Sequence, residues 1–284
     1  MFTVRRPVGA GQEMDYVSAS ASEGELKRVG APPNWKSKAS SIKNQGQCGA
    51  CWAFTSVGLY ESWMKFKGQQ EYDLSEEFIL ECTNSLHANN YTSDCTGGYT
   101  DFALQVVKNY GVPTETNWPY KAAAYGSIRG APSSPGICST NQSFIKYNTL
   151  PGAKDPLNVT RYDNRTAAQI ATLLESGPLG AMMYVDSTFQ AYRGGIYTLC
   201  PNFTQAFNGI NHAVVIVGMD ADNNYIIKNS WGTVWGDSGF ATVSSTNDCA
   251  LSAYVFKLSW GYQLVGSSLL VLLGLLVLFA CKID

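Results

Sequence analysis

The sequence predicts an α+β protein with two lobes, a helical lobe followed by a lobe built on a β-sheet. Apolar side chains recur at helical spacing in the first half, and short runs rich in β-branched and aromatic residues fill the second half. The 284 residues are 45% hydrophobic and 15% charged, which is enough for a large core. Two lobes of different type leave a cleft between them, and we expect the functional site there.

Three helices are predicted in the first half. The first covers residues 51–66, where apolar residues recur at roughly helical spacing. The second follows Ser75, which precedes two acidic residues, and it ends near Cys82. The third covers residues 100–110 and is closed by Gly111.

The second half is predicted to be mainly β. One more helix, over residues 166–176, comes first, because Gly177 and Pro178 stop it. Strand-like runs then alternate with Gly, Asp and Asn, and their sequences are GAMMYV, HAVVIVGM, YIIKN, GFATVS and AYVFKL.

Charge and modification signals limit the function classes. A formal net charge of −2, without long basic runs, gives no support for a nucleic-acid partner. Five glycosylation sequons, together with eight cysteines, favour an oxidising secretory route. The sequon asparagines are Asn90, Asn141, Asn158, Asn164 and Asn202.

Cys51 lies in the stretch KNQGQCGACWAFT and opens the first predicted helix. Unpaired N–H groups and the positive end of the helix dipole favour an anion there, so this thiol should ionise more easily than a free cysteine, whose pKa is about 8.5. A thiolate at this position is a nucleophile. The alternatives are a buried structural cysteine, a disulfide with Cys48, or the redox or metal chemistry typical of C-x-x-C pairs.

A thiolate hydrolase needs an imidazole that pairs with the sulfur and later protonates the leaving amine. The chain has two histidines: His87 lies in a polar loop, and His212 begins the run HAVVIVG. We expect His212 to be the base, although a lone histidine on an apolar strand is more commonly part of the core. Asn229 is the candidate that orients the ring, with Trp231 shielding their hydrogen bond, as in the Cys-His-Asn variant of the catalytic triad.

Five motifs follow one another along the chain in this order: QGQCGACWAF, CTGGY, FQAYRGGIY, NHAVVIVG and KNSWGTVWGDSGF. Their C-G-A-C-W segment fits the C-G-[SA]-C-[WY] signature. Through them, about residues 32–258 resemble the papain family of cysteine proteases, and its cathepsin L-like members in particular. The resemblance implies a papain-like two-lobed fold, with an N-terminal helical lobe, a C-terminal antiparallel β-barrel-like lobe and the active site in the cleft.

The resemblance also implies the roles of the site residues. Cys51 matches the nucleophile, His212 the base and acid, and Asn229 the orienting amide. Gln45 matches the glutamine that forms the oxyanion hole with the Cys51 backbone N–H. The expected activity is that of an endopeptidase working through a thioacyl-enzyme, without cofactor or metal, because the two histidines leave no histidine pair for the carboxyl-gripping loop of exopeptidases in this family.

Substrate and inhibitor contacts follow from the same matches. Gly97 and Gly98 would pair through their backbone with an extended polypeptide substrate. The mostly apolar wall of the pocket for the second residue before the scissile bond predicts Leu, Val or Phe rather than Arg, because Tyr254 shortens it. The remaining substrate-binding positions are Tyr99, Thr100, Met182, Ile210, Asn211, Ala213 and Trp231. Cystatin-like proteins and pro-segments are the implied inhibitors.

The resemblance further implies three disulfides, although six cysteines allow 15 connectivities and the sequence itself selects none. The implied pairs are Cys48 with Cys95, Cys82 with Cys138, and Cys200 with Cys249.

The domain organisation expected from these matches has four parts. Residues 1–30 resemble the remnant of a pro-segment or a linker, and residues 31–258 form the peptidase domain, with the helical lobe over about 31–140 and the β lobe over about 141–258. Residues 259–281 are interpreted as a single transmembrane helix, because their apolar run LVGSSLLVLLGLLVLFAC is uncharged. Residues 282–284 would then be a short cytosolic tail.

Other interpretations of this tail are a buried helix or the signal for a GPI anchor, which lacks its polar spacer here. Cys281 at the membrane edge is a candidate for palmitoylation. The preferred reading is a single-pass membrane protein, with its catalytic domain in a lysosome-like or endosome-like lumen or outside the cell.

Two functions compete. The first is a membrane-anchored cysteine endopeptidase, favoured because Gln45, Cys51, His212 and Asn229 are all present. The alternative is a catalytically silent, glycosylated binding module with the same fold at a membrane surface, made plausible by the missing pro-segment. Transpeptidation through the same acyl-enzyme is not distinguished from hydrolysis by the sequence.

Overall fold

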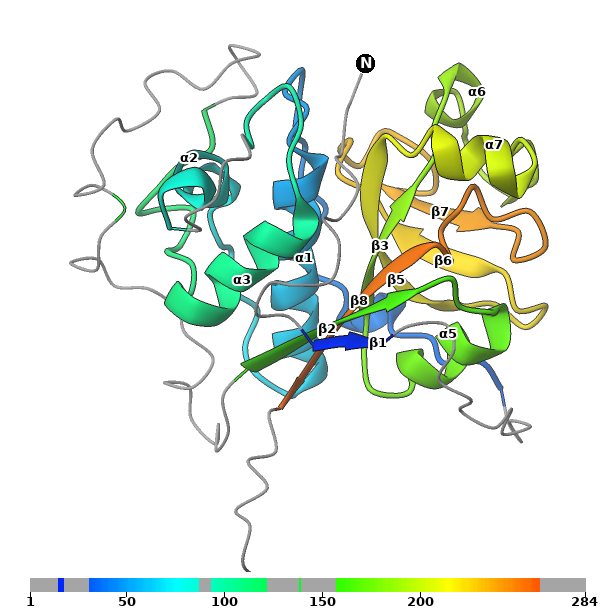
Figure 1. Cartoon of the computed structure of the whole chain (residues 1–284), viewed down its shortest axis with the longest axis horizontal. Helices are drawn as coiled ribbons and strands as arrows, with labels where there is room; N and C mark the ends of the chain where they lie inside the picture. The colour runs from blue at the N-terminus through cyan, green and yellow to red at the C-terminus, as the bar shows by residue number, and fades with distance from the viewer. Residues whose placement is uncertain (1–14, 18–30, 87–92, 122–137, 139–156, 261–284) are drawn as a thin grey trace, which may run out of the picture.

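The computed structural model describes residues 15–17, 31–86, 93–121, 138 and 157–260. Helices α1 (Cys51–Phe66), α2 (Glu76–Leu86) and α3 (Thr100–Tyr110) gather on one side of the molecule, and the sheet with the smaller helices lies on the other (Figure 1). The two-lobed α+β arrangement expected from the sequence is therefore confirmed.

Helix α1, Cys51–Phe66, is the central element. All of its residues from Cys51 to Met64 are buried, since α1 packs against α2 (Glu76–Leu86) and α3 (Thr100–Tyr110) and also against the sheet. A helix buried on all sides carries mainly apolar and small residues on every face, and Glu61 is the charged exception within Cys51–Met64.

The helices differ little from the sequence-based expectation. The first and third have the predicted bounds, and Gly111 closes α3 with a φ of 80°. Helix α2 continues to Leu86, four residues past the predicted end near Cys82, and Ser75 Oγ accepts a hydrogen bond from the N–H of Phe78 at its start. The fourth predicted helix is α5, Ala167–Leu174.

Eight strands form one sheet in the order β1-β2-β8-β3-β5-β6-β7-β4. The β1–β2 and β4–β7 pairs are parallel and the other pairs are antiparallel. The strands are β1 (Asp15–Val17), β2 (Leu157–Asp163), β3 (Leu179–Met183), β4 (Ile196–Tyr197), β5 (His212–Met219), β6 (Tyr225–Lys228), β7 (Phe240–Val243) and β8 (Tyr254–Trp260).

The expectation of an antiparallel barrel-like lobe needs correction. Strands β1 and β4 stand at opposite ends of the order, so the described part of the sheet is open, and its two edge pairs are parallel. The physical reason is that β4 has only two residues and β1 only three, which is too little backbone to close a ring of hydrogen bonds.

Two apolar clusters make up the core. One joins the three large helices to the near face of the sheet, and the other lies within the sheet lobe under α5. Because α1 belongs to the first cluster together with β3 and β5, the first residues of α1 and of β5 are held against each other.

Three disulfides connect the described residues, and they are the pairs that the resemblance implies. They join Cys48 to Cys95, Cys82 to Cys138, and Cys200 to Cys249.

The C-terminal expectation needs one change. Within the described residues, no helix combines the length and apolar character that a membrane crossing requires. Strand β8 continues through Trp260, so the first two residues assigned to the predicted span belong to the sheet. The rest of the span, the tail and Cys281 lie outside the described residues, as do His87 and all of residues 1–30 except β1.

Candidate active site

Cys51 is the first residue of α1, and its side chain is completely buried. The structure pairs Cys48 with Cys95 and leaves Cys51 as a free thiol, so the two cysteines of the C-x-x-C segment do not form a disulfide together. The loop before the helix is tight, because a Cβ at Gly49 would lie 2.6 Å from the carbonyl oxygen of Cys95. This close approach fixes where α1 begins.

The sulfur of Cys51 faces the start of β5. Backbone N–H groups of Ala213, Trp52 and Cys51 itself are hydrogen-bonded to it, and Ala213 directly follows His212. Burial nevertheless raises the pKa of Cys51 to about 12, and these hydrogen bonds act in the opposite direction. The expectation that the helix start lowers the pKa of Cys51 is therefore wrong for the thiol considered without a charged partner. Loss of hydration raises this pKa more than the backbone N–H groups at the helix start lower it.

His212 is the first residue of β5 and is also completely buried. Its Nε2 lies 2.8 Å from Oδ1 of Asn229, so with that oxygen as acceptor the imidazole carries its proton on Nε2 and offers Nδ1 as the basic nitrogen. Burial lowers the pKa of His212 to about 4, although the bond to Asn229 raises it. The structure thus brings together the histidine and the amide that the sequence predicts.

Asn229 is fixed from two further directions. Its Oδ1 also accepts a hydrogen bond from the N–H of Ser230 at 2.9 Å, and its own N–H donates to the carbonyl of Gly239 at 3.0 Å. The indole of Trp231 lies beside the imidazole, with ring centroids 4.7 Å apart. A ring at this distance excludes water from the His212–Asn229 bond, as the sequence suggested.

Gln45 is buried between α1 and the Asn229 segment. Its Nε2 donates to the carbonyl of Cys48 at 2.9 Å, and its Oε1 accepts from the hydroxyl of Ser230 at 2.6 Å. The amide nitrogen carries two hydrogens, so one donor remains for an incoming oxyanion. Tyr120 donates from its hydroxyl to the backbone carbonyl of Gln45 at 2.9 Å.

Sequence reasoning missed Ser230 and Tyr120. Ser230 follows Asn229 directly, so its place within the KNSWG motif was the available signal. Tyr120 carries no local signal, since it reaches Gln45 from 75 positions away.

The two glycines assigned to substrate pairing differ in their surroundings. The N–H and the carbonyl of Gly97 both pair with the backbone of Asp94, at 3.1 and 2.9 Å, and its φ is 134°. Gly98 packs against Trp52, and a Cβ on it would collide with the indole. Among the described residues, the main chain of Gly97 is therefore already committed to a local turn, whereas Gly98 is glycine because Trp52 needs its space.

The predicted pocket wall comes from both lobes. Tyr99 and Thr100 are buried at the start of α3, while the other positions belong to the sheet lobe. Met182 pairs with Ala213 across β3 and β5, Ile210 precedes β5, and Tyr254 begins β8.

Asn211 stands apart from this wall. Its Oδ1 accepts from the N–H of Val185 at 2.9 Å, and its Nδ2 donates to the carbonyl of Val185 at 2.8 Å. Both ends of the amide are thus engaged in holding the approach to β5.

The described sequons differ in exposure. Asn158 is half-buried in β2, which is paired on both sides, whereas Asn164 and Asn202 are exposed. Asn90 and Asn141 lie outside the described residues. The described residues also contain no cluster of three or more His, Cys, Asp or Glu suited to a metal ion.

Cys51 is a free thiol at a helix start, His212 directly precedes the residue whose N–H reaches that sulfur, and Asn229 is bonded to the imidazole. This arrangement is the one expected of a cysteine hydrolase. Comparison with known proteins makes this specific: residues 32–258 match the papain family cysteine protease domain, and the chain belongs to that family. The match covers the whole peptidase region expected from the sequence motifs.

Relatives and solved structures agree with this assignment. The chain is 34% identical to the gamete and mating-type specific protein A of Dictyostelium discoideum over 223 residues, which cover 78% of this chain and 44% of that protein. It is 28% identical to a putative cathepsin L 3 of Paramecium tetraurelia, over 86% of this chain and 68% of the relative. The chain thus spans less than half the length of the Dictyostelium relative.

Among solved structures, a Carica candamarcensis cysteine protease in complex with E-64 superposes with a TM-score of 0.62 at 27% identity, covering 82% of this chain and all of that one. A digestive procathepsin L2 proteinase from Tenebrio molitor gives a TM-score of 0.67, covering 90% of this chain and 77% of that one; at 23% identity it supports the fold alone.

Proposed function

We propose that the chain is an active cysteine endopeptidase. The observation that supports this most directly is that Cys51 points its sulfur at the residue after His212, while His212 is held by Asn229 at 2.8 Å. The proposed nucleophile thus faces the strand start that carries the proposed base, and the base is bonded to its proposed orienting group, which supports this assignment.

In the proposed reaction, the thiol proton of Cys51 moves to Nδ1 of His212, and the thiolate attacks the carbonyl carbon of the scissile bond. Gln45 Nε2 and the Cys51 backbone N–H donate to the oxyanion that forms. His212 then gives its proton to the leaving amine, which leaves a thioacyl-enzyme. Water, deprotonated by His212, releases the acid and restores the thiol.

Burial disfavours each charge by itself, because the pKa of Cys51 is raised to about 12 and that of His212 is lowered to about 4. Transfer of one proton between them creates two opposite charges side by side, and their attraction in a poorly hydrated site offsets the desolvation. The thiolate is thus tied to an imidazolium rather than formed alone.

The proposed substrates are extended polypeptides with Leu, Val or Phe at the second position before the scissile bond. Tyr254 supports this, because its ring packs against that of Phe207 with centroids 5.8 Å apart and so is held in place. Replacing Tyr254→Glu should raise cleavage of substrates with Arg at that position; no gain in Arg substrates would count against the assignment of this pocket.

Glycosylation and membrane anchoring are further parts of the proposal. Exposed sequons at Asn164 and Asn202 and three disulfides support an oxidising lumenal or extracellular setting. Anchoring is supported by the apolar run before Lys282. Extraction of cell membranes with alkaline carbonate tests it: an anchored chain stays in the pellet, and a chain in the supernatant contradicts the span.

The test of the central proposal compares the full chain with Cys51→Ser on Phe-Arg and Leu-Arg amide substrates. We expect cleavage by the wild type and none by Cys51→Ser, with intact disulfides in both. A disulfide-bonded wild type that binds peptides without cleaving them would favour the silent binding module instead.

A further inference from the structure

A polar cavity lies in the sheet lobe, apart from the site described above. Its volume is about 210 Å³. It is lined by the segment 165–167 at the start of α5, the first residue of α7 (Phe203–Asn208), the first residue of β6, and residues 245–248 and 252 of the segment 245–252. None of its lining residues belongs to α1, α2 or α3. The proposed peptidase mechanism uses no residue of this cavity.

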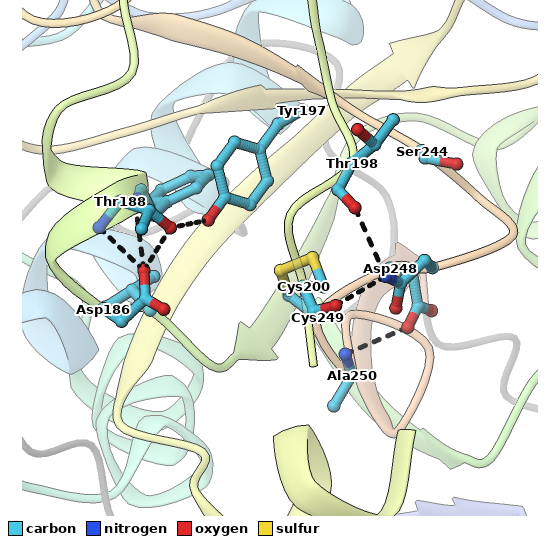
Figure 2. The surroundings of a disulfide bond; sticks show 12 residues. Asp186, Thr188, Tyr197, Thr198, Cys200, Ser244, Asp248, Cys249 and Ala250 are labelled. Carbon is cyan, nitrogen blue, oxygen red and sulfur yellow. Dashed lines mark hydrogen bonds between the residues drawn. A yellow bond between two sulfur atoms is a disulfide. The ribbon is translucent and has the colours of Figure 1, made fainter. Parts of the chain in front are cut away.

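One wall of the cavity is rigid. Figure 2 shows the Cys200–Cys249 disulfide beside Asp248, whose carboxyl accepts a hydrogen bond from the N–H of Ala250. The other carboxyl oxygen accepts from the N–H of Ser252 at 3.0 Å. The acceptor groups on this side are therefore fixed in place before any ligand arrives.

The remaining walls mix polar side chains and the aromatic side chain of Phe203, whose ring stacks on that of Phe207 with centroids 5.9 Å apart. Arg165 lines the cavity and is only 3% exposed, with its guanidinium over the ring of Tyr162 at 5.3 Å. Ser245 and Thr246 also line it, and the Thr246 hydroxyl is bonded to that of Ser244. Phe203 lines the cavity while its residue is 45% exposed. An aromatic face beside hydroxyls, a cation and a carboxylate suits a ligand that has an apolar face and a rim of hydroxyl groups. Asp248 makes a simple anion a poorer fit, because its carboxylate faces the same space.

Two sequons border this cavity. Asn202 is exposed and directly precedes Phe203, and its Oδ1 accepts from the N–H of Gln205 at 3.0 Å to cap α7. The helix thus uses the oxygen of the amide, and the nitrogen is the end that carries an N-linked glycan. Asn164 is also exposed and directly precedes Arg165.

We propose that this cavity is a sugar-binding site that holds one pyranose-sized residue, and that the first N-acetylglucosamine of a glycan on Asn202 occupies it. The apolar face of the sugar packs on Phe203, and its hydroxyl and amide groups bond with the polar walls. A sugar held in this way would tie α7 to the segment 245–252.

The test uses the full chain made in a host that adds N-glycans, trimmed by an endoglycosidase to a single N-acetylglucosamine per site. Thr204→Ala removes the sequon but keeps Asn202 and its cap on α7. We expect backbone amide hydrogen exchange in the segment 245–252 to be roughly tenfold slower in the wild type than in Thr204→Ala. Asn164→Asp removes the neighbouring sequon and should leave that protection in place.

Two further variants test whether a sugar bound in the cavity causes the slower hydrogen exchange. Phe203→Ala and Ser245→Leu, which fills the cavity, should both abolish the protection. Leu199→Ala is the matched control, because Leu199 is also an exposed apolar residue, at 66%, but does not line the cavity. Protection that persists in Ser245→Leu would overturn the proposal.

A second arm distinguishes a tethered sugar from a free one. The chain lacking both sequons, Asn164→Asp with Thr204→Ala, is titrated with free N-acetylglucosamine and followed by saturation-transfer NMR. Signal that disappears in Ser245→Leu supports a sugar site supplied from outside, even where Asn202 carries no glycan. Absence of both the protection and the free-sugar signal overturns the sugar assignment.

Discussion

Burial affects Cys51 and His212 in opposite directions, and the chemistry of the site depends on this pair of shifts. The pKa of the thiol is raised to about 12 and that of the imidazole is lowered to about 4, so both groups favour their neutral forms when considered singly. Activity as proposed requires that the two titrate together as one coupled unit.

The coupling predicts a change in His212 when the sulfur is removed. In Cys51→Ala the imidazole should titrate near its buried value of about 4, whereas in the wild type an ion pair keeps it protonated to higher pH. Imidazole NMR signals measure this, and His87→Gln assigns them, because the chain has only two histidines. Equal titration in both proteins would contradict the ion pair.

The lowered pKa of His212 should make the stability of Cys51→Ala depend on pH. Its folded state holds His212 with a pKa below the ordinary 6.5, so the unfolded state binds the proton first. The free energy of unfolding should therefore fall as the pH falls from about 6.5 through about 4. Urea unfolding at several pH values measures it, and a loss that lies above this window would exclude His212 as its source.

Gln45 provides a test of the oxyanion site. Replacing Gln45→Ala removes one donor and should lower kcat by about 10²–10³, with little change in KM, because that donor acts on the transition state. The variant also loses the bonds to Cys48 and Ser230, so unchanged disulfides and thermal unfolding serve as its control. A change confined to KM would argue against the assigned role.

At the scale of single residues, the sequence predicted the pairing of His212 with Asn229 but not the environment of Cys51. The order of motifs was enough to select the three side chains. The predicted direction of the Cys51 pKa shift was wrong because burial dominates that shift. Burial depends on how the helices pack against the sheet, and the local sequence around Cys51 does not reveal it.

A buried group of charged side chains lies beside helix α1. Lys43 Nζ lies 2.9 Å from Glu61 of α1 and 3.0 Å from Glu76 at the start of α2, and both carboxylates are almost completely buried. Burial raises the pKa of Glu76 to about 8, although Lys43 lowers it. Lys43 therefore holds two buried acids between the helices that carry and support the site.

Removing this cation should destabilise the fold in a pH-dependent way. Lys43→Met leaves Glu61 and Glu76 without it, and the loss should be about 3–5 kcal/mol. Because burial favours the protonated form of Glu76, whose pKa is raised to about 8, the loss should be smaller at pH 5 than at pH 8. Lys36→Met is the control, since the Lys36–Asp237 pair is exposed and should contribute about 0–1 kcal/mol. Equal losses at both pH values would contradict this account.

Helix α5 offers a second test at this scale. Thr166 caps it, with the N–H of Gln169 donating to its Oγ1 at 3.2 Å and the Gln169 side chain accepting from the Thr166 N–H at 3.0 Å. Thr166→Ala should cost about 1 kcal/mol. Thr172→Ala, an exposed threonine in the same helix, should cost less, and chemical denaturation that finds the reverse order would rule out the cap as the cause.

The elements that the sequence predicted are those with a clear local period. The apolar spacing of α1 and α3 and the continuous apolar run of β5 gave their bounds directly. Strand β2 was missed because its residues alternate imperfectly and its pairing with β8 joins positions about a hundred residues apart. Helix α7 was missed because Asn202 was interpreted as a sequon, whereas its side chain also caps a helix.

At the scale of the whole molecule, the two lobes meet along α1, β3 and β5, and the proposed site lies at that junction. Cys51 begins α1 in the helical lobe, whereas His212 begins β5 and Asn229 follows β6 in the sheet lobe. Catalysis as proposed thus depends on the packing of the lobes, because a small shift of one against the other would separate the sulfur from the imidazole.

The measurement that tests the central claim most directly is a titration of the full chain with a thiol-alkylating epoxide, followed by intact mass and by cleavage of a Leu-Arg amide. We predict one equivalent bound at Cys51, loss of activity in proportion to labelling, and no labelling in Cys51→Ser. A chain that is labelled at Cys51 but shows no cleavage before labelling, or that keeps cleaving after complete labelling, would contradict the assignment of Cys51 as the nucleophile of an active peptidase.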